Sequence, residues 1–392
     1  MSSPFRGRWS LLAFGFAFAF FSNFGQTPFI AVFGGAIRSD FELSNGAWGG
    51  IYFAATLASG LLITKVGGLI DAIPLRRYAL ATVFGLCFSA GLMAVSPHVA
   101  VLAAAIFLLR FFGQGLMTHV SVTAMAREFD TARGRALAIA STGLPLGGSL
   151  FPLLGAVAVT ALGWRGGWIV STLVCLVVVL PLGLHLLRGY GRTVTVAPAP
   201  FAALRFLAQK EMLLALPTLT AMGFIGTAIA FHQVVIAEAK GWPLALFASG
   251  FALSGIASIL GTLASGWAVD RIGPRRPALV FQLPMALACF VLAAGDAPSL
   301  IFVHMALMGL TAGAYAPVTT SLLAEAYGVE RLGAIRATAA AVTVLSTSLS
   351  PLLFGVLVDA GISVNVLMTA LGVFALAAAV TLSASRLVRR AR

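Results

Sequence analysis

The strongest constraint on the fold of this chain is a series of long apolar segments separated by short polar connections. A membrane-spanning helix needs about 20 consecutive, mostly apolar residues, and twelve segments of the 392-residue chain reach that length. They are 10–33, 45–66, 78–96, 99–124, 136–160, 167–187, 212–237, 245–268, 277–294, 299–323, 336–357 and 364–385. With 60% hydrophobic and only 9% charged residues, the composition is far from that of a water-soluble protein. The sequence therefore predicts an all-α membrane protein with twelve transmembrane helices.

A short basic connection occurs twice in the chain, at 67–77 and again 199 residues later at 266–276. Pro152 and Pro351 keep the same offset. A repeat of about half the chain length indicates a duplicated architecture. We expect two six-helix halves, 1–187 and 212–392, joined by a cytoplasmic linker at 188–211, where an Ala-Pro-Ala-Pro run breaks the helix.

The second connection resembles the signature loop of the major facilitator superfamily of membrane transporters, G-x-x-x-D-R-x-G-R-R. The residues that carry this resemblance are Gly266, Asp270, Arg271, Gly273, Arg275 and Arg276, and the first copy keeps Gly67, Asp71, Arg76 and Arg77. The resemblance covers nearly the whole chain and implies two pseudo-symmetric halves that work by alternating access. It also implies that these loop residues latch the halves together in the outward-open state. The alternative is a basic loop that only sets the topology.

The distribution of basic residues predicts how the chain lies in the membrane. If the N-terminus is inside, 21 of the 25 Lys and Arg residues fall in inside segments. The positive-inside rule then places both termini in the cytoplasm of a multi-pass protein of a bacterial inner membrane. A net charge of +13 would suggest a nucleic-acid ligand in a soluble protein, but here the bases lie between apolar segments and no nucleic-acid partner is expected.

Arg110 is the one basic residue that falls near the middle of an apolar segment. A guanidinium cannot shed its proton, and at this depth it needs water or a partner, so it is a functional hypothesis by default. Gln114, Met117 and Ser121 share its face on an ideal helix and would line a polar cavity with it. The run 110–115 also looks like the Arg-containing motif of many family members. The alternative is a structural bond from Arg110 to backbone groups of the first helix.

The acidic residues indicate which charge a substrate carries. All twelve fall in loops or at helix ends, so a mid-membrane cation would have no counter-charge. The Arg fork instead suits a carboxylate, which predicts a small organic anion, of the monocarboxylate kind, moved in symport with protons. The resemblance to oxalate and monocarboxylate carriers is distant, because these carriers commonly have a basic residue in their eighth helix and segment 245–268 has none.

Further polar residues within the apolar segments are candidate substrate ligands. In the first segment, a break is expected at Gly25-Gln-Thr-Pro28, where freed backbone groups would meet the substrate. Packing between helices is the alternative explanation for each of these side chains. Together with Arg110 and Gln114, the candidates are Asn23, Gln26, His232, Gln233, His304, Thr311 and Tyr315.

The sequence contains no phosphate-binding loop, zinc-ligand cluster or catalytic triad, so we expect no enzyme, cofactor or metal site. Cys87, Cys175 and Cys289 lie in apolar segments and are interpreted as packing residues. The expected partners are a small-molecule substrate, protons and lipid, and the expected state is a monomer. Two other functions stay open: export of neutral or hydrophobic compounds, suggested by the glycines of 143–148 and the aromatic content, and a receptor or scaffold derived from a transporter.

Overall fold

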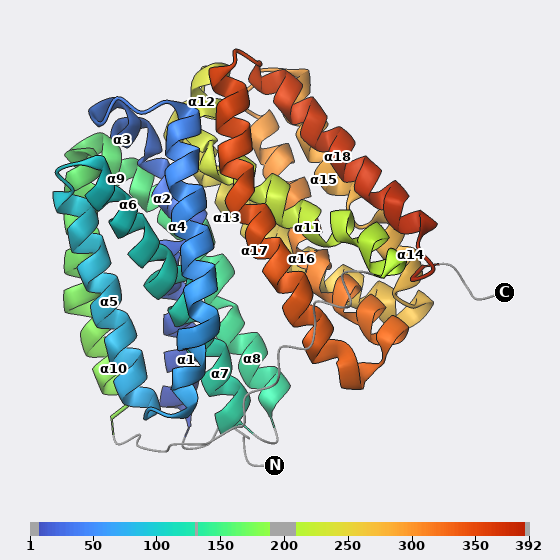
Figure 1. Ribbon diagram of the computed structural model, residues 1–392, viewed down its shortest axis with the longest axis horizontal. Coiled ribbons are helices and arrows are strands. Elements are labelled where there is room, and N and C mark those ends of the chain that lie inside the picture. The colour runs from blue at the N-terminus through green and yellow to red at the C-terminus, as the bar shows by residue number, and fades with distance from the viewer. Residues whose placement is uncertain (1–7, 130–131, 189–208, 389–392) are drawn as a thin grey trace. The chain divides into compact units, whose positions relative to one another are not determined.

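The computed structural model describes residues 8–129, 132–188 and 209–388, and every regular element in these ranges is helical (Figure 1). Two compact units are present. The first comprises residues 1–43 and 50–198, and the second comprises 44–49 and 199–392. Most of the predicted linker lies outside the described residues, so the boundary at 188–211 stays a prediction.

The first unit is built from α-helices that are interrupted by short 3-10 and π segments. In chain order these are α1 (Trp9–Phe21), η1 (Ser22–Gly25), α2 (Thr27–Val32), α3 (Gly34–Asp40), α4 (Asn45–Val66), η2 (Gly67–Asp71), α5 (Leu75–Val95), α6 (Val99–Leu108), η3 (Leu109–Met117), α7 (Thr118–Glu128), α8 (Arg133–Ser141), α9 (Gly143–Val174), η4 (Cys175–Val179) and α10 (Leu180–Leu186).

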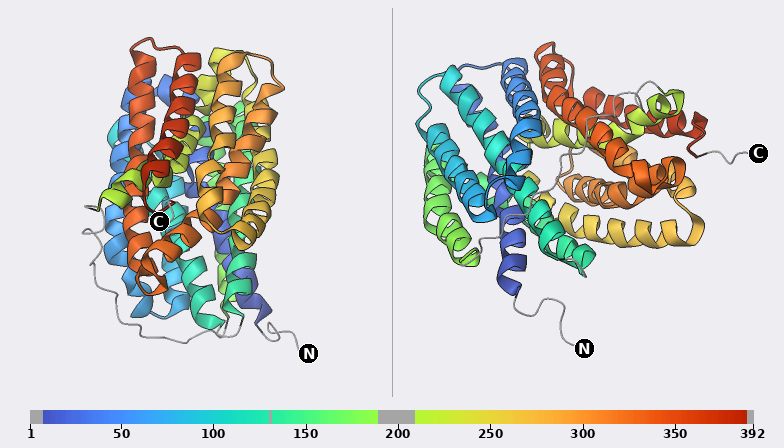
Figure 2. Two further views of the ribbon diagram at one scale, coloured as in Figure 1. Left: turned by 90° about the vertical axis from the view of Figure 1, so that its right-hand side faces the viewer. Right: turned by 60° about the horizontal axis from the view of Figure 1, so that its bottom comes forward.

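The second unit has longer uninterrupted helices. They are α11 (Lys210–Phe231), α12 (Gln233–Lys240), α13 (Leu244–Ile272), α14 (Arg275–Val280), α15 (Leu283–Ala294), α16 (Leu300–Tyr327), α17 (Val329–Asp359) and α18 (Val364–Ala384). Within this unit α13 and α16 pack side by side along much of their length (Figure 2). The two helices approach closely because Gly309 and Gly313 of α16 have no Cβ. A Cβ on Gly313 would lie only 1.9 Å from Ser258 O, and one on Gly309 only 2.3 Å from Ser254 O.

Among the described residues, ten helices are long and apolar enough to cross a membrane, or eleven when the bent pair Trp9–Val32 and Gly34–Asp40 is taken as one span. One of the ten, Arg133–Leu186, has 54 residues and would be about 80 Å long if straight, against about 30 Å of hydrocarbon. Gly163 interrupts it with a φ of 70° that only glycine adopts readily. This break separates the predicted segments 136–160 and 167–187, so the long run holds two of the predicted spans.

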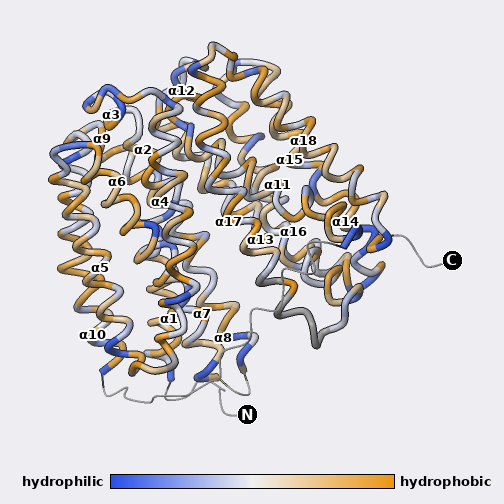
Figure 3. The backbone as a smooth tube through the Cα atoms, viewed as in Figure 1, coloured by the Kyte–Doolittle hydropathy of each residue, from blue (hydrophilic) through white to orange (hydrophobic). Residues whose placement is uncertain are grey.

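The hydropathy of the chain follows the same arrangement: apolar residues cover the helices, and hydrophilic residues gather at helix ends and connections (Figure 3). Exposed apolar side chains such as Phe84, Phe88, Val177 and Leu263 are 56–70% accessible. A water-soluble protein rarely exposes so many large apolar groups. The fold is therefore that of a multi-pass helical membrane protein.

Candidate functional site

The first membrane helix breaks where the sequence predicts it. Helix α1 ends at Phe21, η1 continues to Gly25, Gln26 is extended with φ −82° and ψ 151°, and α2 begins again at Thr27. Pro28 lies in the first turn of α2, where its fixed φ suits the helix and it has no N–H to leave unpaired. The break frees backbone carbonyls at the end of η1, among them Gly25 O.

The broken helix crosses η3 with its backbone in direct contact. A Cβ on Gly25 would lie 2.2 Å from Leu109 O and 2.6 Å from Gln114 N, and a Cβ on Gly113 would lie 2.7 Å from Gly25 Cα. Only two glycines facing each other allow this approach. We call the crossing of Gly25 with Gly113, together with Arg110, Thr27 and Tyr52 beside it, the helix-break site; all of it lies within the first unit.

Arg110 is enclosed in the helix-break site. Its side chain is 2% exposed, and Nη1 donates to Gly25 O at 3.1 Å and to Thr27 Oγ1 at 3.4 Å. The guanidinium carbon lies 5.0 Å from the centre of the Tyr52 ring, and the Tyr52 and Thr27 hydroxyls bond each other. The carbonyl end of a helix and the face of an aromatic ring both stabilise a positive charge.

This geometry shows what holds Arg110 inside the first unit. The guanidinium is bonded to the backbone of the first helix, which is the structural alternative. Its Nε is buried without a hydrogen-bond acceptor among the described residues. Whether the guanidinium also contacts a substrate stays a prediction.

The polar stripe was predicted from an ideal α-helix, and this segment does not have that geometry. Residues 109–117 form a π-helix, which takes more residues per turn than an α-helix and so changes which side chains share a face. Met117 is fully buried, and the Ser121 hydroxyl donates to Gly15 O of α1 at 2.6 Å. Gln114 is half-buried beside the glycine crossing.

The two amides predicted on the first helix have different surroundings. Asn23 is 3% exposed and its Nδ2 donates to Phe20 O at 2.9 Å and to Leu144 O at 3.1 Å, so it joins η1 to α9. Its role as a substrate ligand stays a prediction. Gln26 is half-buried at the break itself. Of the candidates in the first unit, Gln26 and Gln114 therefore keep accessible side chains next to the helix-break site.

The predicted ligands of the second unit are mostly engaged in packing. His232 Nε2 donates to Pro351 O at 2.9 Å, and His304 Nδ1 donates to Ala288 O at 3.0 Å, so both rings join neighbouring helices. Tyr315 is half-buried and donates to Leu219 O at 2.7 Å. Gln233 and Thr311 are fully buried, and the Thr311 hydroxyl has no partner among the described residues.

The first signature connection is held by α7. Its residues 67–71 form the 3-10 helix η2, where His119 Nε2 donates to Gly67 O at 3.0 Å and Arg127 donates to Ile70 O at 3.3 Å. Arg76 and Arg77 are exposed, and the Asp71 side chain lies outside the described residues. The contact of His119 with Gly67 could not be predicted from the sequence.

The second signature connection is mostly helical. Helix α13 runs to Ile272, and only Gly273, with φ 75°, and Pro274 interrupt it before α14. Arg275 pairs with Glu325 at 2.8 Å, and the Arg271 guanidinium lies over the Trp267 ring. Of the other residues of this connection, Asp270 and Arg276 are exposed, and Gly266 has open space around its Cβ position. The latch role of these residues stays a prediction.

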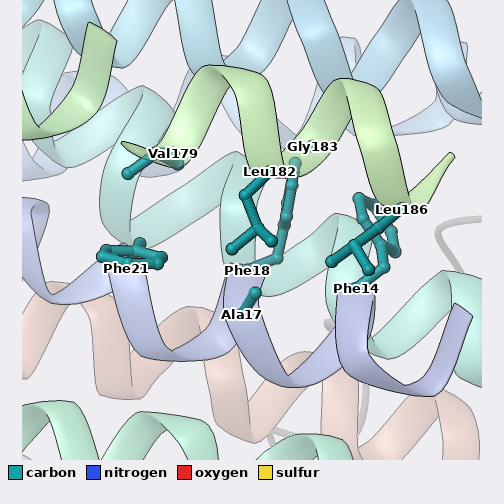
Figure 4. A pocket seen from close by; sticks show the side chains of 8 residues that line it. All are labelled: Phe14, Ala17, Phe18, Phe21, Val179, Leu182, Gly183 and Leu186. Carbon is teal, nitrogen blue, oxygen red and sulfur yellow. The ribbon is translucent and has the colours of Figure 1, made fainter. Parts of the chain in front are cut away.

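The phenylalanines of the first helix pack within their own unit. Phe151 of α9 contacts Phe20, Phe21, Phe24 and Phe29, at centroid distances of 4.7–6.4 Å. On another side of α1, Phe14, Phe18 and Phe21 face η4 and α10 across a pocket with wholly apolar walls (Figure 4). An ionised ligand would find no partner in that pocket.

Sequence reasoning missed Tyr52 as the partner of Arg110. The available signal was a phenol in the middle of segment 45–66, since a buried tyrosine hydroxyl usually needs a hydrogen-bond partner. The π-helical form of 109–117 had no recognisable signal beyond the closely spaced Gly113 and Gly115. Among the described residues, no group of three or more His, Cys, Asp or Glu is placed to hold a metal ion.

Two helical units, membrane-length apolar helices and a broken first helix that crosses a glycine of another helix define a multi-pass helical membrane protein. The model of the major facilitator superfamily matches residues 12–261 and 213–392, and the chain belongs to this family. It is a secondary transporter and not an enzyme.

Several known proteins are similar to the chain. An MFS-type transporter of an Ophiocordyceps species is 24% identical over 83% of this chain and 73% of its own length. A multidrug resistance protein B homologue of Mycobacterium tuberculosis is 32% identical, but over only 33% of this chain and 23% of its own. The fold is shared with a bacterial homologue of the human lysosomal transporter Spinster (TM-score 0.73, 15% identity, 98% and 96% of the two chains) and with a peptide transporter bound to alafosfalin (TM-score 0.71, 16% identity, 97% and 96%).

Proposed function

We propose that the chain exports uncharged or hydrophobic organic compounds in exchange for protons. The observation that carries this proposal is the state of Arg110, whose charge is engaged by Gly25 O, Thr27 and Tyr52 inside the first unit. A guanidinium that is 2% exposed and already bonded is a poor primary ligand for an anion, because the anion would first have to displace these contacts.

Two further points support an uncharged or hydrophobic substrate. In the ranges that the structure describes, the carboxylates lie in connections or near helix ends, so a cationic substrate would find no counter-charge midway along these helices. The partial similarity to a multidrug resistance protein also fits an exporter. In this proposal Arg110 is a positioning residue, which fixes the broken first helix against η3, and Gln26 and Gln114 supply hydrogen bonds to the substrate.

The second candidate function is the uptake of a small organic anion together with protons. One observation favours it: the Nε of Arg110 is buried without an acceptor among the described residues, and a charged group with spare hydrogen-bonding capacity is costly in a membrane. A carboxylate that reaches this N–H would compensate it. This candidate makes Arg110 a direct ligand.

Transport by the purified full chain in proteoliposomes distinguishes the two functions. With a proton gradient imposed, we expect an uncharged fluorescent dye to move in the direction opposite to the protons. We expect labelled monocarboxylates not to be transported and not to inhibit transport of the dye. Monocarboxylate uptake that follows the protons, and that is lost in Arg110→Gln but kept in the exposed control Arg133→Gln, would refute the export proposal in favour of the second function.

The same variants test the role of Arg110. As a positioning residue, Arg110→Gln lowers the thermal unfolding midpoint as well as transport, because Gly25 O loses a charged donor. If Arg110 is a substrate ligand, the variant also loses the rise in the midpoint that bound substrate gives the wild type; as a positioning residue only, it keeps that rise.

A further inference from the structure

Two of the three cysteines lie against each other inside the first unit. Cys87 is on α5 and Cys175 is the first residue of η4, and each thiol is the side-chain partner of the other. Their side chains are 5% and 0% exposed, and α5 packs on η4 along this stretch. The sequence separates them by 88 residues, so the contact arises only from the packing of the helices.

The backbone at Cys175 is unusual. Residues 175–179 form a π-helical segment between α9 and α10, and such segments inside longer helices are frequent at functional sites. The widened turn begins at the thiol itself. This local irregularity is a second feature, independent of the thiol contact, that marks the position.

The two elements that carry the thiols also carry exposed apolar side chains. Phe84 and Phe88 of α5 are 56% and 61% exposed, and Val177 of η4 is 70% exposed. In a membrane these side chains meet acyl chains and not water. Uncharged, lipid-soluble reagents can therefore approach α5 and η4 through the acyl chains, whereas charged reagents such as glutathione are excluded from them.

We propose that Cys87 and Cys175 are a dithiol oxidation site within the first unit, which an uncharged, lipid-soluble two-electron oxidant converts to an α5–η4 disulfide. Two S–H bonds break and one S–S bond forms; the oxidant takes up the two electrons and the two protons. With an azodicarboxamide, the N=N double bond becomes an HN–NH hydrazine. Thiols already in contact need little backbone movement to reach disulfide geometry.

Cys289 is the matched control within the same chain. It is fully buried in the core of the second unit, packed among residues such as Met285 and Leu292, and no thiol partner lies beside it among the described residues. An oxidant that simply reached every buried cysteine would modify Cys289 as readily as the pair. The difference between Cys289 and the pair therefore reports on the contact.

The experiment uses the full chain in lipid nanodiscs treated with the azodicarboxamide diamide. We expect the intact mass to fall by two hydrogens. Alkylation after unfolding in detergent should count one thiol per chain in place of three, and a reducing agent should restore all three. Peptide mapping should join the segment around Cys87 to that around Cys175.

Single substitutions complete the test. Cys87→Ser and Cys175→Ser should each abolish the mass change, while Cys289→Ser should keep it and leave no alkylatable thiol after oxidation. The proposal is overturned if folded wild type keeps three thiols under conditions that oxidise the detergent-unfolded chain, if the lost thiols map to Cys289, or if Cys175→Ser loses two hydrogens as the wild type does. These results do not depend on which solute is transported.

Discussion

The glycine crossing at the helix-break site predicts a large effect from a single methyl group. In Gly25→Ala the new Cβ would lie 2.2 Å from Leu109 O, which is 1.2 Å closer than the 3.4 Å at which ordinary contacts begin. The atoms it meets are backbone atoms of Leu109, Gly113 and Gln114, so no side chain can rotate away. The first helix and η3 must therefore separate by about 1 Å.

Two costs follow from that separation. Overpacking of this kind costs about 1–3 kcal/mol. The movement also takes the 3.1 Å bond from Arg110 to Gly25 O beyond hydrogen-bonding distance, and a bond from a charged donor is worth about 1.5–3 kcal/mol. The greater helix propensity of Ala offsets at most about 1 kcal/mol. We expect a net loss of about 3 kcal/mol, which lowers the thermal midpoint by roughly 10 °C at about 2–4 °C per kcal/mol.

The assay is thermal unfolding of the detergent-purified protein, with transport measured in proteoliposomes. Gly134→Ala is the control, because Gly134 is exposed in α8 and nothing lies within 4 Å of its Cβ position. Gly113→Ala should reproduce the defect from the opposite side, and the double variant should cost less than the two single losses together, since the crossing is already open. A Gly25→Ala protein with the midpoint and transport rate of Gly134→Ala would refute the reasoning.

Two further substitutions test the packing of each unit. Phe151→Ala removes the ring that four phenylalanines contact, and we expect it to lower the free energy of unfolding by about 3 kcal/mol. This is at the low end for Phe→Ala because lipid weakens the transfer term. The control Phe84→Ala changes a side chain that is 56% exposed and should be close to neutral, so equal thermal midpoints for the two variants would contradict this prediction. Lys240→Met leaves Gly295 O, Asp296 and Asn365 without the buried ammonium that joins them at 2.7–2.9 Å, with an expected loss of about 2 kcal/mol. Asp296→Asn keeps an oxygen that accepts from Lys240 and should lower the stability less, because the Asp296 side chain is 67% exposed and its charge is well screened. A larger loss of stability in Asp296→Asn than in Lys240→Met would count against this account.

The helical membrane fold could be predicted from the sequence because bilayer thickness and hydropathy decide it almost alone. The break at Gly25–Pro28 was predictable for a similar reason: Gly and Pro act on the backbone locally, whatever packs around them. Segments 136–160 and 167–187 were separated correctly at the non-helical Gly163.

The surroundings of single side chains were less predictable. The sequence predicts that Arg110 needs a partner, but the partners lie on Gly25, Thr27 and Tyr52, far away in the sequence. Helical periodicity failed between Arg110 and Ser121 because η3 is not an α-helix. The histidines were ambiguous for another reason: a ring that bonds a backbone carbonyl, as His232 and His304 do, has the same sequence appearance as one that meets a substrate.

The π-helical form of η3 has a consequence for comparing this chain with its relatives. A π turn amounts to one residue inserted into an α-helix, so a relative without the insertion would present its equivalent residues rotated by about 100° beyond this point. An alignment without a gap here would match either Arg110 or Ser121 to its true equivalent, but not both. Deleting one residue between Leu109 and Met117 would likewise turn His119 and Ser121 away from the carbonyls of Gly67 and Gly15 that they now contact.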